Sequence, residues 1–177
     1  AVCLIRLPMI RSCWLVLRWY LLAALVVLLD QLSKYSVSAT FRYGESVEIL
    51  PFLNLTLVYN LGAAFSFLSD AGGWQRWVFT LIGAAVSLFI LLWISRLEAS
   101  QRLLAASLSL VLGGALGNLW DRVALGHVID FIDVYYQSYH WPAFNIADSA
   151  ITLGAVLLVL ESLLAGRGSH KEEENHE

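Results

Sequence analysis

Long apolar runs dominate the pattern of this chain and predict helices that cross a membrane. Residues 77–94 and 103–120 carry no charged side chain. A helix of that length, rising about 1.5 Å per residue, crosses most of a hydrocarbon core about 30 Å thick. Two further runs, at 14–36 and 143–165, are apolar apart from a few ionisable residues. We therefore predict four spans, at about 14–36, 76–95, 103–121 and 143–165.

The first run also has features of a cleavable signal peptide. Basic residues precede it, an apolar stretch covers residues 19–29, and small residues occur within 36–39. Asp30 and Lys34, however, fall where a signal peptide should be neutral. The run also reaches spanning length if Arg18 extends its charged end to the interface. We therefore interpret it as a retained span.

The segments between the spans predict structure outside the membrane. Within the segment 37–75, residues 47–60 alternate apolar and polar side chains in part, which predicts a small external β-sheet between spans 1 and 2. The segment 122–142 carries aromatic side chains suited to the headgroup level, and we expect an external loop or short helix there. We predict an all-α membrane bundle forming a single integral membrane domain over residues 1–165, followed by a disordered polar tail over 166–177.

Composition and charge support the membrane assignment and suggest its orientation. The chain is 59% hydrophobic and 14% charged, whereas soluble domains are about 25% charged. The basic residues are dispersed, which argues against a nucleic-acid partner. Positive side chains collect on the cytoplasmic side of membrane proteins. The larger group of basic residues therefore places both termini in the cytoplasm, namely Arg6, Arg11, Arg18, Arg96, Arg102, Arg167 and Lys171. The smaller group on the outer side is Lys34, Arg42, Arg76 and Arg122.

Asp130 and Asp148 are the main candidates for chemistry. Each lies at the edge of an apolar segment, where an ionised carboxylate is costly and usually has a function. Two carboxyl groups that share one proton can activate water for peptide hydrolysis. In the predicted orientation both lie, with Asp30, toward the outer face. The pattern therefore indicates one polar site near the external leaflet, typical of an intramembrane aspartic peptidase.

Simpler roles remain open for both acids. Asn145 and Asp148 lie three residues apart at a predicted helix start, which is a capping arrangement with an acid in the first turn. Asp130 could be an interfacial acid, paired with Arg122 or solvated by headgroups, although Asp133 suits that role better. The residues alone leave open whether the two carboxyl groups meet.

Other polar residues could support such a site. Asn118 shares a helical face with Asp121 and Arg122, and this group could form an interfacial ion pair or hold substrate carbonyl groups. Asp30 and Lys34 are a favourable acid-first pair four residues apart.

Asn60 and Gly62 could turn a loop or present groups to a substrate. His127 is interpreted as a loop histidine, because no second His or Cys lies at metal spacing, and no metal site is predicted. The sequence contains no zinc-peptidase motif, serine-nucleophile elbow, P-loop or dinucleotide fingerprint.

Five ordered motifs add a more specific interpretation. They are Asp30-Gln31-Leu32-Ser33-Lys34, Asn60-Leu61-Gly62-Ala63-Ala64-Phe65, Gly117-Asn118-Leu119-Trp120-Asp121-Arg122, Val128-Ile129-Asp130-Phe131 and Phe144-Asn145-Ile146-Ala147-Asp148-Ser149. In this order they resemble the signature boxes of the bacterial lipoprotein signal peptidases (signal peptidase II), which are intramembrane aspartic peptidases. The similarity covers about residues 30–154.

The resemblance implies roles for these residues and a substrate. Asp130 and Asp148 would be the catalytic dyad. The residues that would position substrate or support the site are Asn118, Arg122, Asn145, Asn60, Gly62, Asp30 and Lys34. The substrate would be a prolipoprotein with a diacylglyceryl cysteine, cleaved just before that cysteine. Members of the family act in the bacterial cytoplasmic (inner) membrane without a cofactor and are blocked by globomycin. We expect a monomer among membrane lipids.

Two rival functions can be distinguished from a peptidase. A small proton-coupled transporter also uses intramembrane acids, but it needs a polar route to the cytoplasm, and the cytoplasmic halves of the spans are almost wholly apolar apart from Glu161. A non-enzymatic assembly protein should tolerate Asp130→Asn if the protein still folds.

Overall fold

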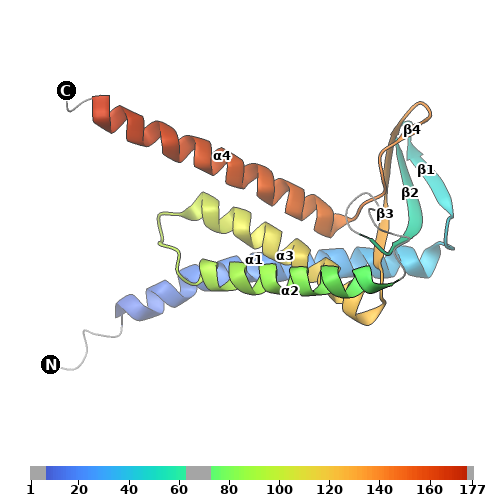
Figure 1. Cartoon of the computed structure of the whole chain (residues 1–177), viewed down its shortest axis with the longest axis horizontal. Helices are drawn as coiled ribbons and strands as arrows, with labels where there is room; N and C mark the ends of the chain where they lie inside the picture. The colour runs from blue at the N-terminus through green and yellow to red at the C-terminus, as the bar shows by residue number, and fades with distance from the viewer. Residues whose placement is uncertain (1–6, 63–72, 175–177) are drawn as a thin grey trace.

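Four long helices form the body of the protein, as shown by a computed structural model that describes residues 7–62 and 73–174 (Figure 1). They are α1 (Leu7–Thr40), α2 (Trp74–Ile94), α3 (Arg102–Ala124) and α4 (Ile146–Glu174). Each contains a stretch that is long and apolar enough to cross a membrane. The four predicted spans are thereby confirmed as four apolar helices.

The end of α4 differs from the prediction. The polar residues 166–174, predicted to be disordered, continue the helix to Glu174. The segment contains Lys171 and Glu172, which are compatible with a helix, and has no proline to end it. Residues 175–177 lie outside the described part of the chain.

A four-stranded antiparallel sheet lies at one end of the helices (Figure 1). Its strands, in spatial order, are β1 (Ser46–Leu50), β2 (Leu53–Asn60), β3 (Val128–Tyr136) and β4 (Tyr139–His140). The prediction of strand at 47–60 was correct, but the prediction of a loop or short helix within 122–142 was wrong. Val128–Tyr136 is rich in β-branched and aromatic residues, which favour a strand, and it pairs with β2.

α3 is the central helix and packs against the other three helices. Half of its most apolar window is buried, compared with 17% for each of the other three. Its glycines allow this close packing. A Cβ atom at Gly113 would overlap Ala23 and Val26 of α1, and one at Gly114 would overlap the carbonyl oxygen of Ala147 in α4. The glycines therefore hold α1 and α4 close to the end of α3 that carries the polar motif.

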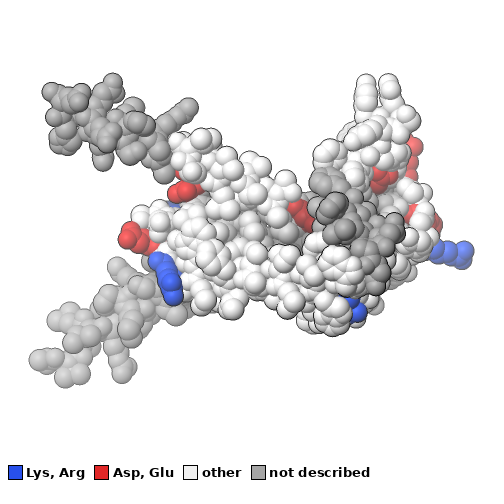
Figure 2. All heavy atoms as spheres, in the orientation of Figure 1, with Lys and Arg blue, Asp and Glu red and all other residues white. Residues whose placement is uncertain are grey.

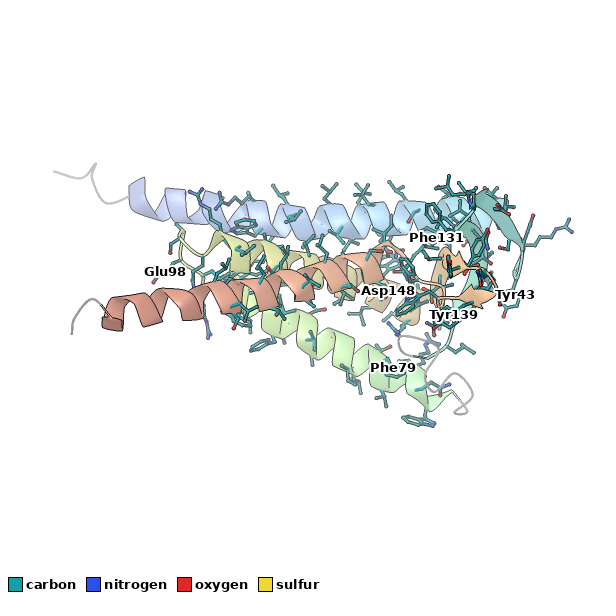
Figure 3. All side chains as sticks on the ribbon, turned by 90° about the horizontal axis from the view of Figure 1, so that it is seen from above. Tyr43, Phe79, Glu98, Phe131, Tyr139 and Asp148 are labelled. Carbon is teal, nitrogen blue, oxygen red and sulfur yellow. The ribbon has the colours of Figure 1, made fainter. Side chains whose placement is uncertain are left out.

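Charged side chains lie mainly toward the two ends of the molecule. Figure 2 shows them there, with a broad uncharged surface between them on the face in view. In Figure 3, Tyr43, Tyr139 and Asp148 lie toward the sheet end, and Glu98 lies toward the opposite end. The candidate site therefore lies near one end of the apolar bundle, next to the sheet.

Candidate active site

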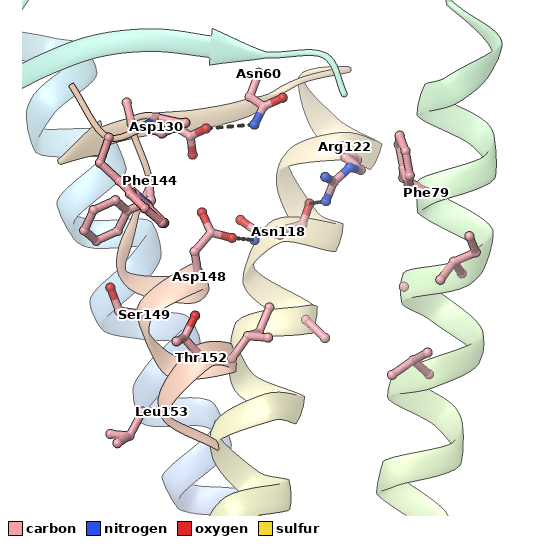
Figure 4. Close-up of a pocket in the computed structure, with 18 of the residues that line it drawn as sticks. Asn60, Phe79, Asn118, Arg122, Asp130, Phe144, Asp148, Ser149, Thr152 and Leu153 are labelled. Carbon is pink, nitrogen blue, oxygen red and sulfur yellow. Dashed lines mark hydrogen bonds between the residues drawn. The ribbon is translucent and has the colours of Figure 1, made fainter. Parts of the chain in front are cut away.

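The structure brings Asp130 and Asp148 into one pocket. Asp130 is carried by β3, and Asp148 by the first turn of α4. Both line a cavity of about 840 Å³ between the sheet and the helices, and their carboxyl groups point into the same space (Figure 4). Two acids 18 positions apart in the chain, at 130 and 148, therefore share one site.

Asn145 connects the two acids. Its side-chain amide donates to Asp130 Oδ1 at 2.7 Å, and its backbone N–H donates to Asp148 Oδ2 at 3.3 Å. In return, Asn145 Oδ1 accepts the backbone N–H of Asp148 at 2.9 Å. This reciprocal pair is the capping arrangement that the sequence suggested. The residues that cap α4, Asn145 and Asp148, are therefore also part of the site.

Asn60 holds the other oxygen of Asp130. Its side-chain amide donates to Asp130 Oδ2 at 2.9 Å, and its Oδ1 accepts the backbone N–H of Gly62 at 3.0 Å. Arg122 then donates from Nη2 to the carbonyl oxygen of Gly62 at 3.1 Å. The Asn60–Gly62 segment was predicted to turn a loop or present groups to a substrate. It connects the end of β2 to Asp130 of β3 and to Arg122 of α3. Residues 63–65 of this motif lie outside the described part of the chain.

Asn118 connects Asp148 to a buried lysine. Its Nδ2 donates to Asp148 Oδ1 at 2.7 Å, while its Oδ1 accepts from Lys34 Nζ at 3.0 Å and from Asn145 Nδ2 at 3.2 Å. Because two donors meet the same oxygen, the amide is held with its nitrogen toward the carboxyl group. The orientation of Asn118 thus presents a donor to Asp148.

A buried cluster of charges supports this network. Lys34 Nζ lies 2.7 Å from Asp30 Oδ2 and 2.8 Å from Asp121 Oδ2, and all three side chains are at most 2% exposed. Asp30 Oδ1 also accepts the backbone N–H of Ala147 at 2.9 Å, next to Asp148. The predicted Asp30–Lys34 pair is confirmed by these contacts.

Sequence reasoning missed the role of Asp121. It was grouped with Asn118 and Arg122 on one helix, but it pairs with Lys34 of α1 and accepts from Gln31 at 2.8 Å. Spacing within one helix cannot reveal such a partner. A possible signal was the occurrence of one lysine and several acids within otherwise apolar spans, since buried charges require partners.

Burial and like charge raise the pKa of Asp130 to about 7. Loss of solvation has the largest effect, and the negative charge of Asp148 adds to it. Hydrogen bonds from Asn60 and Asn145 and the charge of Lys34 lower the pKa and offset part of the rise. Asp130 can therefore hold a proton near neutral pH, as a general acid requires.

Asp133 and His127 lie outside this network. Asp133, predicted to be a solvated or Arg122-paired interfacial acid, is instead buried. It accepts from Asn54 at 2.8 Å and lies 2.9 Å from His140 Nδ1. His127 lies between α3 and β3, with its ring 4.2 Å from that of Tyr59, and burial lowers its pKa. Among the residues whose side chains the structure describes, 16–62 and 73–164, no three or more His, Cys, Asp or Glu residues are grouped to hold a metal ion.

The rest of the pocket is mainly apolar. α2 contributes Phe79, Ile82 and Val86, and α4 contributes Leu153 and Val156. Figure 4 shows Phe79 on α2 across the pocket from Asp148 on α4, with Thr152 and Leu153 further along α4. A polar end with two acids thus continues into a space suited to apolar groups.

Fold and site together define a membrane protein that holds paired carboxyl groups at the polar end of an apolar pocket. The sequence model of the family described as signal peptidase (SPase) II matches residues 22–164. This match covers most of the chain, so the protein belongs to the signal peptidase II family. The family resemblance read from the five motifs is confirmed.

Curated relatives match the sequence of this chain over most of their length. The chain is 57% identical over 147 residues to the lipoprotein signal peptidase of Cupriavidus necator, covering 83% of each chain. It is 52% identical over 159 residues to that of Alteromonas mediterranea, covering 90% of this chain and 86% of the relative. A solved structure of a bacterial membrane enzyme matches with a TM-score of 0.76 and 35% identity, over 86% of this chain and 90% of that one.

Proposed function

We propose that this chain is an aspartic endopeptidase that removes the signal peptide from diacylglyceryl-modified prolipoproteins, cutting just before the lipid-modified cysteine. The relatives named lipoprotein signal peptidase support the substrate class. The observation that carries the catalytic type is the pair of carboxyl groups, Asp130 and Asp148, that face one pocket and are connected by Asn145.

In the proposed chemistry the two acids share one proton. Asp130 holds it, because burial and the charge of Asp148 raise the pKa of Asp130 to about 7. Asp148 is the carboxylate, since it lies in the first turn of α4, where the helix dipole favours negative charge.

A water molecule between the acids attacks the scissile carbonyl carbon. As the water oxygen bonds to that carbon, Asp148 takes a proton from the water. Asp130 gives its own proton to the carbonyl oxygen of the substrate. The C–N bond then breaks, the leaving nitrogen receives the proton held by Asp148, and a proton returns to Asp130 from the intermediate. The products are a new carboxyl end and a new amine end.

The neighbouring polar groups hold the acids and the substrate backbone. Asn60, Asn118 and Asn145 donate to the dyad, which fixes both carboxyl groups before the substrate arrives. Arg122 lines the pocket and already donates to a backbone carbonyl oxygen, that of Gly62. We assign it the same contact with a substrate carbonyl. Lys34 supports the site by donating to Asn118, and Asp30 supports it by accepting the backbone N–H of Ala147.

The apolar part of the pocket suits a substrate that stays in the membrane. A signal peptide and a diacylglyceryl group are both apolar, and α2 and α4 line the cavity with apolar side chains. Four apolar helices and the family indicate a multi-pass protein of the bacterial inner membrane. We further propose cytoplasmic termini, a site and sheet at the outer leaflet, a monomeric enzyme, and inhibition by globomycin-type molecules that occupy this pocket.

The relatives do not favour the transporter alternative, and the pocket gives it no support. The lining of the pocket is mainly apolar away from the dyad and its polar neighbours.

Cleavage of a diacylglyceryl prolipoprotein by the purified protein tests the proposal. Asp130→Asn and Asp148→Asn should each abolish cleavage while the protein stays folded. Asp133→Asn is the matched control, because Asp133 lies in the same strand but outside the pocket lining, and it should retain activity. A folded Asp130→Asn or Asp148→Asn protein with substantial activity would remove that residue from the mechanism.

A further inference from the structure

Arg76, near the start of α2, contacts the end of α3 that carries the polar motif. Its Nε donates to the carbonyl oxygen of Arg122 at 2.8 Å, and its Nη2 donates to that of Val123 at 2.9 Å. Neither the candidate chemistry nor the motifs of the chain involve Arg76. The charge pattern of the sequence places Arg76 on the outer side of the membrane.

These contacts satisfy groups that a helix end leaves without partners. The last four carbonyl groups of a helix lack an intrahelical donor, and α3 ends at Ala124. The carbonyl of Asp121 is met by the backbone N–H groups of Leu125 and Gly126. Those of Arg122 and Val123 are met by the planar, two-pronged guanidinium of Arg76, a geometry that lysine cannot reproduce.

The chain after α3 is shaped to fit this guanidinium. Gly126 has φ +87°, a left-handed conformation that glycine adopts without strain. A Cβ atom at Gly126 would lie 3.1 Å from Arg76 Nη1. The guanidinium is therefore held between the carbonyl groups of α3 and the turn that leads into β3 and Asp130.

The same face of α2 contacts the side chain of Arg122. Phe79 follows Arg76 by three residues, so the two lie on one face of the helix, and the guanidinium of Arg122 lies 5.6 Å from the centre of the Phe79 ring. Arg76 thus fixes the backbone of Arg122, and Phe79 borders its charged end. α2 packs chiefly against α3. The hydrogen bonds of Arg76 therefore join the α2 wall of the pocket to the end of α3 that carries Arg122.

We infer that Arg76 is a positioning residue that clamps the start of α2 to the end of α3 and thereby holds Arg122 in the place from which it binds the substrate backbone. This inference rests on the proposed function, in which Arg122 contacts a substrate carbonyl. Arg76 is not among the residues that line the pocket, and of those residues it hydrogen-bonds only the backbone of Arg122 within the described part of the chain. Its effect on cleavage should therefore pass through substrate binding rather than through the acids.

Steady-state cleavage by Arg76→Gln, Arg76→Lys and a control, Arg42→Gln, tests this role. Arg42 is an exposed arginine beyond the end of α1 that is not part of the pocket lining. In Arg76→Gln, KM should rise by about 10-fold or more, because small misplacements of a positioning group are costly. The pH midpoint that reports Asp130 should not move. Arg76→Lys should be intermediate, and Arg42→Gln should match wild type. An unchanged KM with a lower kcat would overturn the inference, because a merely structural residue lowers the fraction of active enzyme.

A double-mutant cycle shows whether the effect passes through Arg122. In an Arg122→Lys background, Arg76→Gln should change KM far less than in wild type, because the group that Arg76 positions is gone. Full additivity of the two substitutions would overturn the inference.

Hydrogen exchange tests the clamp without any substrate. In Arg76→Gln, backbone amides of residues 74–80 and 121–127 should exchange faster than in Arg42→Gln, and the rest of the helices should not change. Equal exchange in the two variants would overturn the clamp whether or not the protein cleaves prolipoprotein. A wild-type protein that cleaves nothing would instead overturn the proposed function and the use of Arg122 in it, while the exchange result would still decide the clamp.

Discussion

The side-chain amide of Asn145 donates a 2.7 Å hydrogen bond to Asp130. The backbone N–H of the same asparagine donates to Asp148 at 3.3 Å. One residue at the start of α4 therefore sets the positions of both acids, and it also caps the helix that carries one of them. Asn60 and Asn118 each hold one of the two carboxyl groups from another element, whereas Asn145 contacts both.

Removing this bridge should impair catalysis and shift its pH dependence. We expect Asn145→Ala to lower kcat by about 100-fold or more, as loss of a fixed donor at a reacting group does in other enzymes. The hydrogen bond lowers the pKa of Asp130, so the remaining activity should extend to higher pH. Asn54→Ala is the matched control, because Asn54 donates to Asp133 in the same sheet. Equal losses in the two variants would contradict the role of Asn145.

The activity of the wild-type protein should fall as pH rises through about 7. Asp130 must carry a proton to act as the acid, and burial and the charge of Asp148 raise its pKa to about 7. Below that value the acid is protonated, and above it the proton is lost. A pH–rate profile of kcat between pH 5 and 9 measures this. A rate that climbs from pH 7 to 8 would show that Asp130 works as a carboxylate instead.

The buried charge cluster should be needed for stability. Lys34→Met removes the partner of Asp30 and Asp121, both of which lie within 2.8 Å of Lys34 Nζ. A buried ion pair that loses one member costs about 3–5 kcal/mol, so a marked drop in the unfolding temperature is expected in detergent. Adding Asp121→Asn should recover part of the loss, because one unpaired acid is then neutral. A stable Lys34→Met protein, equal to Arg42→Gln, would show that the cluster is not required.

Two glycines make a matched test of how α4 is placed. A Cβ atom at Gly114 would overlap the carbonyl oxygen of Ala147, which precedes Asp148, whereas a Cβ atom at Gly83 would lie 3.7 Å from the nearest atom of Leu119. Gly114→Ala should therefore lower both the unfolding temperature and the rate of cleavage. Gly83→Ala should leave the unfolding temperature close to wild type, since alanine also favours a helix. If both variants unfold at the wild-type temperature, the α3–α4 contact is not as tight as described.

The four spans and the family could be predicted from the sequence because their signals are local. A charge-free run such as 77–94 indicates a span by length alone. Asp30 and Lys34 were predicted to pair because they lie one helical turn apart. The motifs around Asp130 and Asp148 indicated the family, which the comparisons confirmed.

The contacts that could not be predicted join segments far apart in the chain. Lys34 reaches Asp121 only because glycines bring α1 and α3 together. The segment that forms β3 was predicted to be a loop or short helix. The strand was missed because its partner, β2, lies two helices earlier in the chain. The contact of Arg76 with the carbonyl groups of Arg122 and Val123 left no trace in residue spacing, because backbone acceptors carry no sequence signal.

The most direct test compares cleavage rates of wild type, Asp130→Asn, Asp148→Asn and the double variant on one diacylglyceryl prolipoprotein. If the two acids act on a single water with one shared proton, each single variant should fall to background. The double variant should then be no slower, because groups that act as a unit are not additive. Two partial losses that multiply in the double variant would contradict the shared-proton account.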